Sequence, residues 1–247
     1  MYLNKKPALV AAVAAIALAT FLAVTPARAD GLLYQLPQDG TWARYEMEMV
    51  GVSPSGEEMK MGGSLTMSSV GKAEASGEPC RWIEVKMQMR RPDGDEQTIV
   101  AKALVPEKNL KRGENGWASM KKAWIKQPFN ADPEQITEAN GRDVGPLPAF
   151  LAGPLSDSKD LEGIQVESGI GNLQCAGVSG SLKINDGNAD VKIQMENRLN
   201  DMAPFGVVTS TMQFEVTRDG EVREKGTIHF KLAEVGKDAK SELPDAE

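Results

Sequence analysis

The sequence predicts an all-β protein, built as a curved antiparallel sheet or half-open barrel of about 8–10 strands, with a β-sandwich as the alternative. Apolar residues occupy the odd positions of residues 43–49 and again of residues 59–67, with mostly polar residues between them. Alternation with a period of two marks a strand with one wet and one dry face. Loop lengths that bring the dry faces of successive segments together recur along the chain.

The first hairpin shows this agreement most clearly. A three-residue loop, Pro54-Ser55-Gly56, pairs Ser53 with Glu57 and places Tyr45 opposite Leu65. A two-residue loop would set apolar residues against charged ones, so it is rejected.

The second hairpin uses the same turn chemistry. Residues 81–91 alternate, and Pro92-Asp93-Gly94 then forms a three-residue loop that places Met87 opposite Ile99 and Val85 opposite Ala101. A fifth strand is expected within residues 117–126, where the alternation is poor.

A helical and loop insertion is expected over about residues 130–163. Asp132-Pro133-Glu134-Gln135 carries an N-cap, Pro at the first helical position and Gln at N3, the pattern that opens a helix. Residues 145–155 are apolar but interrupted by prolines, so one or two turns are expected around Phe150 and Leu151. Residues 157–163 are expected to form a polar connection.

Two further hairpins complete the domain, which we expect to span residues 30–236. Asp186-Gly187 predicts a two-residue turn that places Ile184 beside Ala189. A three-residue loop at residues 218–220 would pair Val216 with Val222, both on the dry face. Residues 237–247 are expected to form a disordered polar tail.

The N-terminus predicts export to the periplasm or the extracellular space. Two lysines precede an Ala-rich apolar run over residues 7–24, and Ala27-Arg28-Ala29 suits signal peptidase, so residues 1–29 read as a signal peptide. An uncleaved membrane anchor is the alternative. Cleavage leaves 25 basic and 35 acidic residues, a net charge of −10. That charge argues against nucleic acid and anionic lipid surfaces as partners.

The two cysteines, Cys80 and Cys175, favour a disulfide because the count is even and the chain is exported. Two buried thiols are the alternative. No metal site is expected, since only His229 could join the cysteines.

The dry face is rich in methionine, a flexible side chain that suits surfaces accepting varied apolar shapes. One interpretation is a concave pocket for a lipid or other lipophile, with the tips of the helical insertion near its entrance. The other is that methionine fills the core of a curved sheet. The candidate ligand-binding residues are Tyr45, Met47, Met49, Met61, Met67, Met87, Met89, Phe150, Leu151, Met195, Met212 and Phe214.

No catalytic constellation is present, so an enzyme is not expected. Ser119 and Lys122 match an S-x-x-K spacing but lack the companion motifs of penicillin-recognising enzymes. His229 shares its face with basic residues, which is typical of a solvated surface. No cofactor is predicted. A hydrolase of unrecognised type is the least favoured function.

The layout resembles the exported half-barrel proteins of the outer-membrane lipoprotein carrier superfamily. A signal peptide is followed by a meander, a helical interruption and long hairpins with one apolar face, over most of residues 42–232. The resemblance implies an incomplete barrel that accommodates acyl chains; no site residue is carried over. The leading hypothesis is therefore an exported soluble protein that binds a lipophile. The alternative is a protein-interaction module with a packed core, using a sheet edge or the surface around Trp42 and Trp82.

Overall fold

The protein forms one antiparallel sheet, seen here in a computed structural model that describes residues 30–53, 55–90, 94–110, 120–130, 132–136, 151, 153–185 and 189–244. The strand order is β6-β5-β4-β3-β2-β1-β11-β10-β9-β8-β7, with β6 and β7 at the two edges. The strands are β1 (Trp42–Val52), β2 (Glu58–Ala75), β3 (Glu78–Arg90), β4 (Glu96–Pro106), β5 (Lys122–Lys126), β6 (Glu134–Gln135), β7 (Ser156–Ser168), β8 (Gly171–Asn185), β9 (Asp190–Leu199), β10 (Val207–Arg218) and β11 (Glu221–Gly236).

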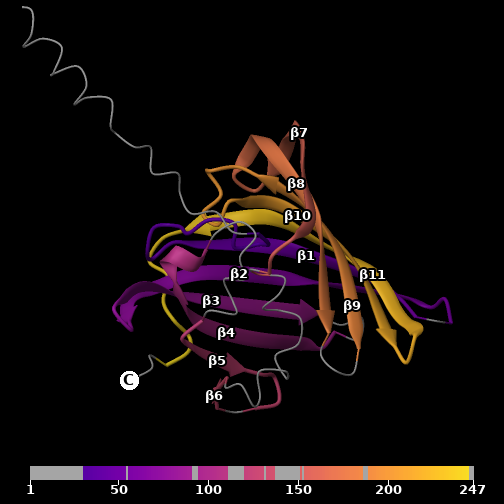
Figure 1. The fold of residues 1–247 in the computed structure, drawn as a ribbon, viewed down its shortest axis with the longest axis horizontal. Coiled ribbons are helices and arrows are strands. Elements are labelled where there is room, and N and C mark those ends of the chain that lie inside the picture. The colour runs from indigo at the N-terminus through magenta and orange to yellow at the C-terminus, as the bar shows by residue number, and fades with distance from the viewer. Residues whose placement is uncertain are drawn as a thin grey trace, which may run out of the picture.

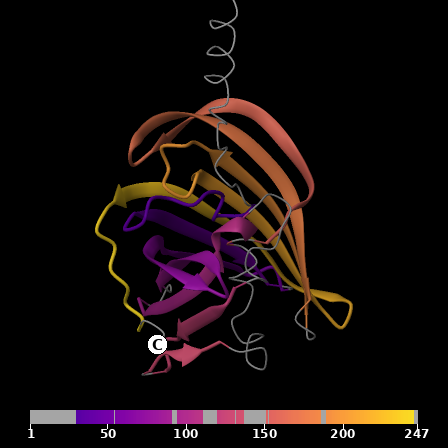
Figure 2. The same ribbon diagram turned by 60° about the vertical axis from the view of Figure 1, so that its left-hand side comes forward.

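The sheet is curved and open. Strands β1 to β6 form one side of the curve and β7 to β10 the other, as Figure 1 shows. Figure 2 shows β7 and β8 arching over the concave side. Since every strand belongs to the same sheet and the edge strands do not pair, the half-open barrel is confirmed and the sandwich is excluded.

The arch is fixed where the tip of the β7–β8 hairpin meets β11. The backbone N–H of Gly169 donates to the carbonyl of Leu232 at 2.8 Å. A Cβ added to Gly169 would lie 1.7 Å from the carbonyl oxygen of Ala233. This close approach of two backbones requires glycine at position 169.

The first two hairpins have the predicted registers. Tyr45 pairs with Leu65, Ser53 N donates to Glu57 O at 3.0 Å, and Met87 lies opposite Ile99. Each register is the one that the predicted three-residue loop and the hydrophobic parity have in common; Pro54 and residues 91–93 of these loops lie outside the described residues.

The predicted register of the β8–β9 hairpin is wrong by two residues. Asn185 pairs with Asp190 and Ile184 with Val191, and the Asn185 side chain donates to Asp190 at 2.7 Å. Residues 186–188 lie outside the described residues. A slip of two keeps every side chain on its own face, so parity alone does not distinguish a two-residue loop from a longer even one.

The β10–β11 register also differs from the prediction. Arg218 pairs with Glu221, so the turn has two residues, Asp219 and Gly220. Both have positive φ, 53° and 78°, as a type I′ turn requires. A register shift then places Val216 opposite Glu224, and Val222, predicted on the dry face, is 45% exposed.

The helix predicted from Asp132 is wrong. Glu134–Gln135 form strand β6, which pairs with β5, and Ile136 N donates to Ala123 O at 2.8 Å. The backbone groups on the open edge of β5 thus take priority over the local capping pattern. The remainder of that prediction, residues 137–150, lies outside the described residues.

The polar connection predicted over residues 157–163 is instead part of strand β7. Its side chains are mostly exposed because β7 is an edge strand whose two faces both meet solvent, which removes the alternation. The expected polar tail is also ordered in part. Leu243 is 4% exposed and residues 241–243 hydrogen bond to Glu84.

The predicted disulfide is wrong: Cys80 and Cys175 are both free and buried. Cys80 packs with Trp82 and Leu104 in a small cluster separate from the main core, whereas Cys175 belongs to the main core. Five strands separate β3 from β8 in the sheet. Burial raises the pKa of both thiols.

We expect the native protein to resist thiol alkylation at pH 7.5. Burial keeps both thiols protonated and inaccessible, and the thiolate is the reactive form. Intact mass after iodoacetamide treatment should be unchanged for the folded protein and should show two additions after unfolding without reductant. A single unmodified mass in denaturant would mean that the cysteines are bonded.

We expect Gly169→Ala to destabilise the protein by about 1–3 kcal/mol, the range for forcing atoms into a filled site. Gly62→Ala is the matched control, because an added Cβ there has no atom within 4 Å. Urea unfolding followed by circular dichroism would measure both. Equal stability of the two variants would show that the β7–β8 tip does not depend on contact with β11.

Candidate ligand-binding surface

One end of the concave face is filled by chain segments that are not strands. Leu33 N donates to Leu151 O at 2.8 Å, and Tyr34 N donates to Phe205 O at 3.1 Å. Asn197 Nδ2 reaches the carbonyl of Gly31 at 3.1 Å. Residues 30–36 and the β9–β10 connection therefore close this end of the half-barrel.

Half of the predicted ligand-binding residues lie in this closed end. They are buried among the residues of the main core rather than lining a surface. Tyr45 also donates its hydroxyl to Val207 O at 3.0 Å. The six residues are Tyr45, Met47, Met67, Leu151, Met195 and Met212, each between 0% and 4% exposed.

The other end of the same face is only half covered. Met49 lies opposite both Met61 and Ile228, and Met87 lies opposite Ile99. All of them are half-buried, as are Met89, Ile184, Val191 and Phe214. We name this surface the apolar band; its residues are Met49, Met61, Met87, Met89, Ile99, Ile184, Val191, Phe214 and Ile228.

The apolar band therefore includes five predicted ligand-binding residues: Met49, Met61, Met87, Met89 and Phe214. Four members were missed, although their parity already placed them on the dry face: Ile99, Ile184, Val191 and Ile228. The signal that identifies them is proximity to the β3–β4, β8–β9 and β10–β11 turns, which lie at one end of the sheet. Phe150 lies outside the described residues.

The convex face carries a hollow lined by Arg44, Lys60, Gly62 and Arg90, among other residues. Each cation has a carboxylate partner: Arg44 with Glu234 at 2.7 Å, Lys60 with Glu58 at 3.0 Å, and Arg90 with Glu96 at 2.7 Å. The positive charge is thus neutralised locally, and the hollow offers no site for an anion.

Neither predicted surface tryptophan is available as an exposed patch. Trp42 donates its indole N–H to the carbonyl of Lys237 at 3.2 Å and covers Gly236. Trp82 is 8% exposed, with the Lys102 ammonium 4.9 Å from its ring centroid.

The single histidine, His229, lies on β11 opposite Thr211 of β10. His229 Nδ1 lies 3.0 Å from the Thr211 hydroxyl. Within residues 30–244, the described positions contain no group of three side chains that could hold a metal ion. In the same set of residues, no helix is long and apolar enough to cross a membrane.

No protein-family model and no curated protein matches the sequence. Solved structures that show similarity to it include the following three. A protein from Bacteroides fragilis described as exported, with a YmcC-like fold, is 10% identical and covers 82% of this chain and 98% of its own (TM-score 0.33). A protein from Parabacteroides distasonis described as a lipoprotein is 10% identical and covers 81% and 97% (0.32).

The third is a LolA superfamily protein from Nitrosomonas europaea, 9% identical, covering 85% of this chain and 89% of its own with a TM-score of 0.32. A member of the superfamily that the sequence resembles is thus among these structures. With TM-scores of 0.32 to 0.33 and identities of 9% to 10%, we take no fold, ligand or site residue from any of them.

We expect Tyr45→Phe to change the pH dependence of stability. Burial raises the pKa of the Tyr45 phenol above its ordinary value, so at high pH the unfolded chain releases a proton that the folded protein retains. The contribution of Tyr45 to the free energy of unfolding should therefore be constant below about pH 10 and fall above it, by up to about 1.4 kcal/mol per pH unit.

The variant lacks this ionisation, and it also loses the bond to Val207, at a cost of about 0.5–1.5 kcal/mol. The stability difference between wild type and variant should accordingly shrink as the pH rises above about 10. Urea unfolding between about pH 8 and pH 11 would measure it. A difference independent of pH would contradict the assignment.

Proposed function

We propose that this protein is an exported binding protein that takes an acyl chain or similar lipophile against the apolar band. The observation that carries the proposal is the gradient of burial along single strands. On β1, Met47 is 4% exposed while Met49, two residues further on the same face, is half-buried. The same change occurs on β2 between Leu65 and Met61.

The chemistry of the band suits a ligand without a defined shape. Four of its nine members are methionines, whose flexible thioether chains adapt to varied apolar surfaces. An acyl chain lying along the band would remove its own methylenes from water, and each buried methylene would favour binding by about 0.8 kcal/mol. This affinity does not require polar side chains in the band, and the alternation of the strands places apolar side chains on this face.

Export supports the proposal from the sequence. A signal peptide over residues 1–29 would deliver the protein to the periplasm or the extracellular space, where a carrier for lipophiles has a role; these residues lie outside the described ones. The net charge of −10 left after cleavage favours a freely soluble carrier over one held on an anionic membrane.

An interaction module based on the tryptophans receives less support, because Trp42 and Trp82 are occupied within the protein. Of the surfaces that the sequence suggested, the sheet edges are left, and β7 is the longer of the two edge strands. It is exposed along most of its length, but it carries Asp157, Asp160 and Glu162, and charged side chains on an edge act against strand pairing.

Met89→Glu should weaken the binding of a fluorescent fatty acid by about tenfold or more. A carboxylate in the band would have to be desolvated beneath the chain, and a tenfold loss corresponds to about 1.4 kcal/mol. Met202→Glu is the matched control: it makes the same change at a side chain that is 66% exposed on the β9–β10 connection.

Fluorescence titration of both variants and wild type would measure the effect, with melting curves to confirm folding. Organic extraction of the purified protein followed by mass spectrometry would search for a resident lipid. Equal affinities in the two variants, or no uptake by wild type together with no extracted lipid, would refute the proposal.

A further inference from the structure

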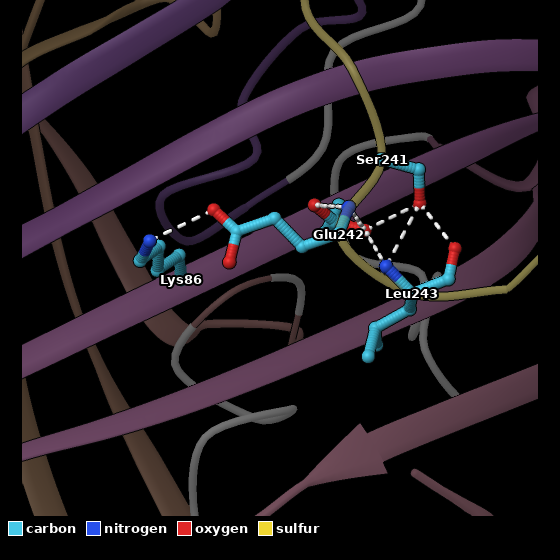
Figure 3. Close-up of polar contacts among 5 residues, drawn as sticks. Lys86, Ser241, Glu242 and Leu243 are labelled. Carbon is cyan, nitrogen blue, oxygen red and sulfur yellow. Dashed lines mark hydrogen bonds and ion pairs between the residues drawn. The ribbon is translucent and has the colours of Figure 1, made fainter. Parts of the chain in front are cut away.

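The C-terminal residues 241–244, here named the C-terminal strap, cross the convex face over β3 and β4. Figure 3 shows Ser241, Glu242 and Leu243 beside Lys86 of β3. The Glu84 carboxylate accepts three hydrogen bonds from the strap: from Ser241 Oγ at 2.6 Å, from Glu242 N at 3.0 Å and from Leu243 N at 3.3 Å. In addition, Lys86 Nζ forms an ion pair with the Glu242 carboxylate at 2.8 Å.

A buried cation completes the contact. Lys102 lies opposite Glu84 in the β3–β4 ladder and is 0% exposed. Its ammonium lies 3.4 Å from the carbonyls of both Leu243 and Pro244. The Glu84 carboxylate thus binds the hydrogen-bond donors of the strap, and the Lys102 ammonium binds its carbonyl acceptors. The Leu243 side chain is buried.

Two tryptophan side chains lie on the face beside the strap. Trp82 lies under Lys102, and Trp124 lies opposite Lys102 on β5. The indole N–H of Trp124 is buried and has no hydrogen-bond partner in the described part of the chain. A buried donor without a partner is costly, and a bound polar group can satisfy it.

The arrangement contributes specificity more than stability. Removing a carboxylate and an ammonium from water offsets most of their attraction, so buried charges are weak evidence for stabilisation. The β3–β4 ladder is continuous without the strap. The charges do, however, restrict which segment can bind there. The segment must offer a hydroxyl and two successive backbone N–H groups, and the residue that carries the second N–H must have an apolar side chain.

We propose that the convex face of β3 and β4 is a peptide-recognition site, which the chain's own strap occupies in cis and which binds in trans a segment with Ser or Thr two residues before Leu. Glu84 reads the hydroxyl and the N–H groups, and Lys102 reads the following carbonyls. The partner is a protein that carries such a segment in an accessible terminus or loop. The site is independent of the lipophile proposed for the concave face.

The strap acts as a competitor. Lys237, Asp238 and Lys240, which link it to β11, are exposed, and a short tether gives an effective concentration on the order of millimolar. A strap whose intrinsic dissociation constant is about 0.1 mM would therefore weaken the binding of an added peptide to wild type roughly tenfold, relative to a protein whose strap is loosened.

The test uses the full-length mature protein and a fluorescent peptide of residues 239–247, read by anisotropy. Leu243→Asp loosens the strap by placing a charge at a buried position; Glu242→Pro is a second loosening variant, since it removes one N–H at an exposed residue. Both should bind the peptide about tenfold more tightly than wild type. Melting curves establish that each variant is folded.

Two matched changes identify the chemistry. Adding Glu84→Gln to the loosened protein should lower peptide affinity at least tenfold, and so should Ser241→Ala within the peptide. Loss of both effects, or no peptide binding by a folded loosened variant at millimolar concentration, would show that the strap is only a structural contact and would overturn the proposal. Binding that follows net peptide charge rather than the hydroxyl would overturn it as well.

Discussion

The whole sheet depends on the pairing of its first and last strands. Strands β1 to β6 form one meander and β7 to β11 another, and the β1–β11 ladder alone joins them in the strand order. The ladder extends from Trp42 paired with Gly236 to Val52 paired with Lys225. Bringing together segments so distant in sequence costs loop-closure entropy, which contacts across the ladder must offset.

Buried apolar pairs supply most of that compensation. Tyr45 lies opposite Leu232 and Met47 opposite Phe230, and all four side chains are between 0% and 4% exposed. The Arg44–Glu234 pair on the outer face is partly exposed, and surface ion pairs contribute little. The concave side of the seam therefore holds the two meanders together, and the convex side mainly fixes their alignment.

This constraint also explains why the concave face has two different ends. A single curved sheet leaves its inner face without a second sheet to cover it, so other parts of the chain must do so. Residues 30–36 lie shortly before β1 and pack at the end of the sheet where β1 begins, and Asp30 accepts a hydrogen bond from Leu155 N at 3.2 Å. Residues 153–155 lie beside the C-terminal half of β8, but the side chains near the other hairpin tips stay half-buried, and the apolar band lies there.

Local features of the sequence predicted much of this arrangement. Period-two alternation and three-residue turns determined the β1–β2 and β3–β4 registers, because only one register satisfied both. Alternation is silent about strand order, so the β1–β11 seam was not predictable from it. Alternation also failed for β7, whose polar side chains reflect its edge position, and for Glu134–Gln135, where a helix-capping pattern gave way to an open strand edge.

The error on the cysteines has a different origin. An even count in an exported chain is a statistical argument, whereas parity is a geometric one. Cys80 shares its parity with Trp82 and Glu84, the outward residues of β3, and Cys175 shares its parity with the buried Leu173. The alternation that predicts the fold places the two thiols on opposite faces of the sheet, where they cannot form a disulfide with each other.

The same alternation gives β3 two separate roles. Val85 and Met87 face inward to the core and the apolar band, and Glu84 and Lys86 face outward to the strap. Between these sets lies only the backbone, which is hydrogen bonded to β2 on one side and β4 on the other.

A strand that is hydrogen bonded on both sides shifts little when a side chain on one face gains or loses a partner. Energetic coupling between the two faces needs an element with two discrete arrangements, and the interior of a paired sheet offers none. A ligand on the concave face and a peptide on the convex face should therefore bind with nearly additive free energies.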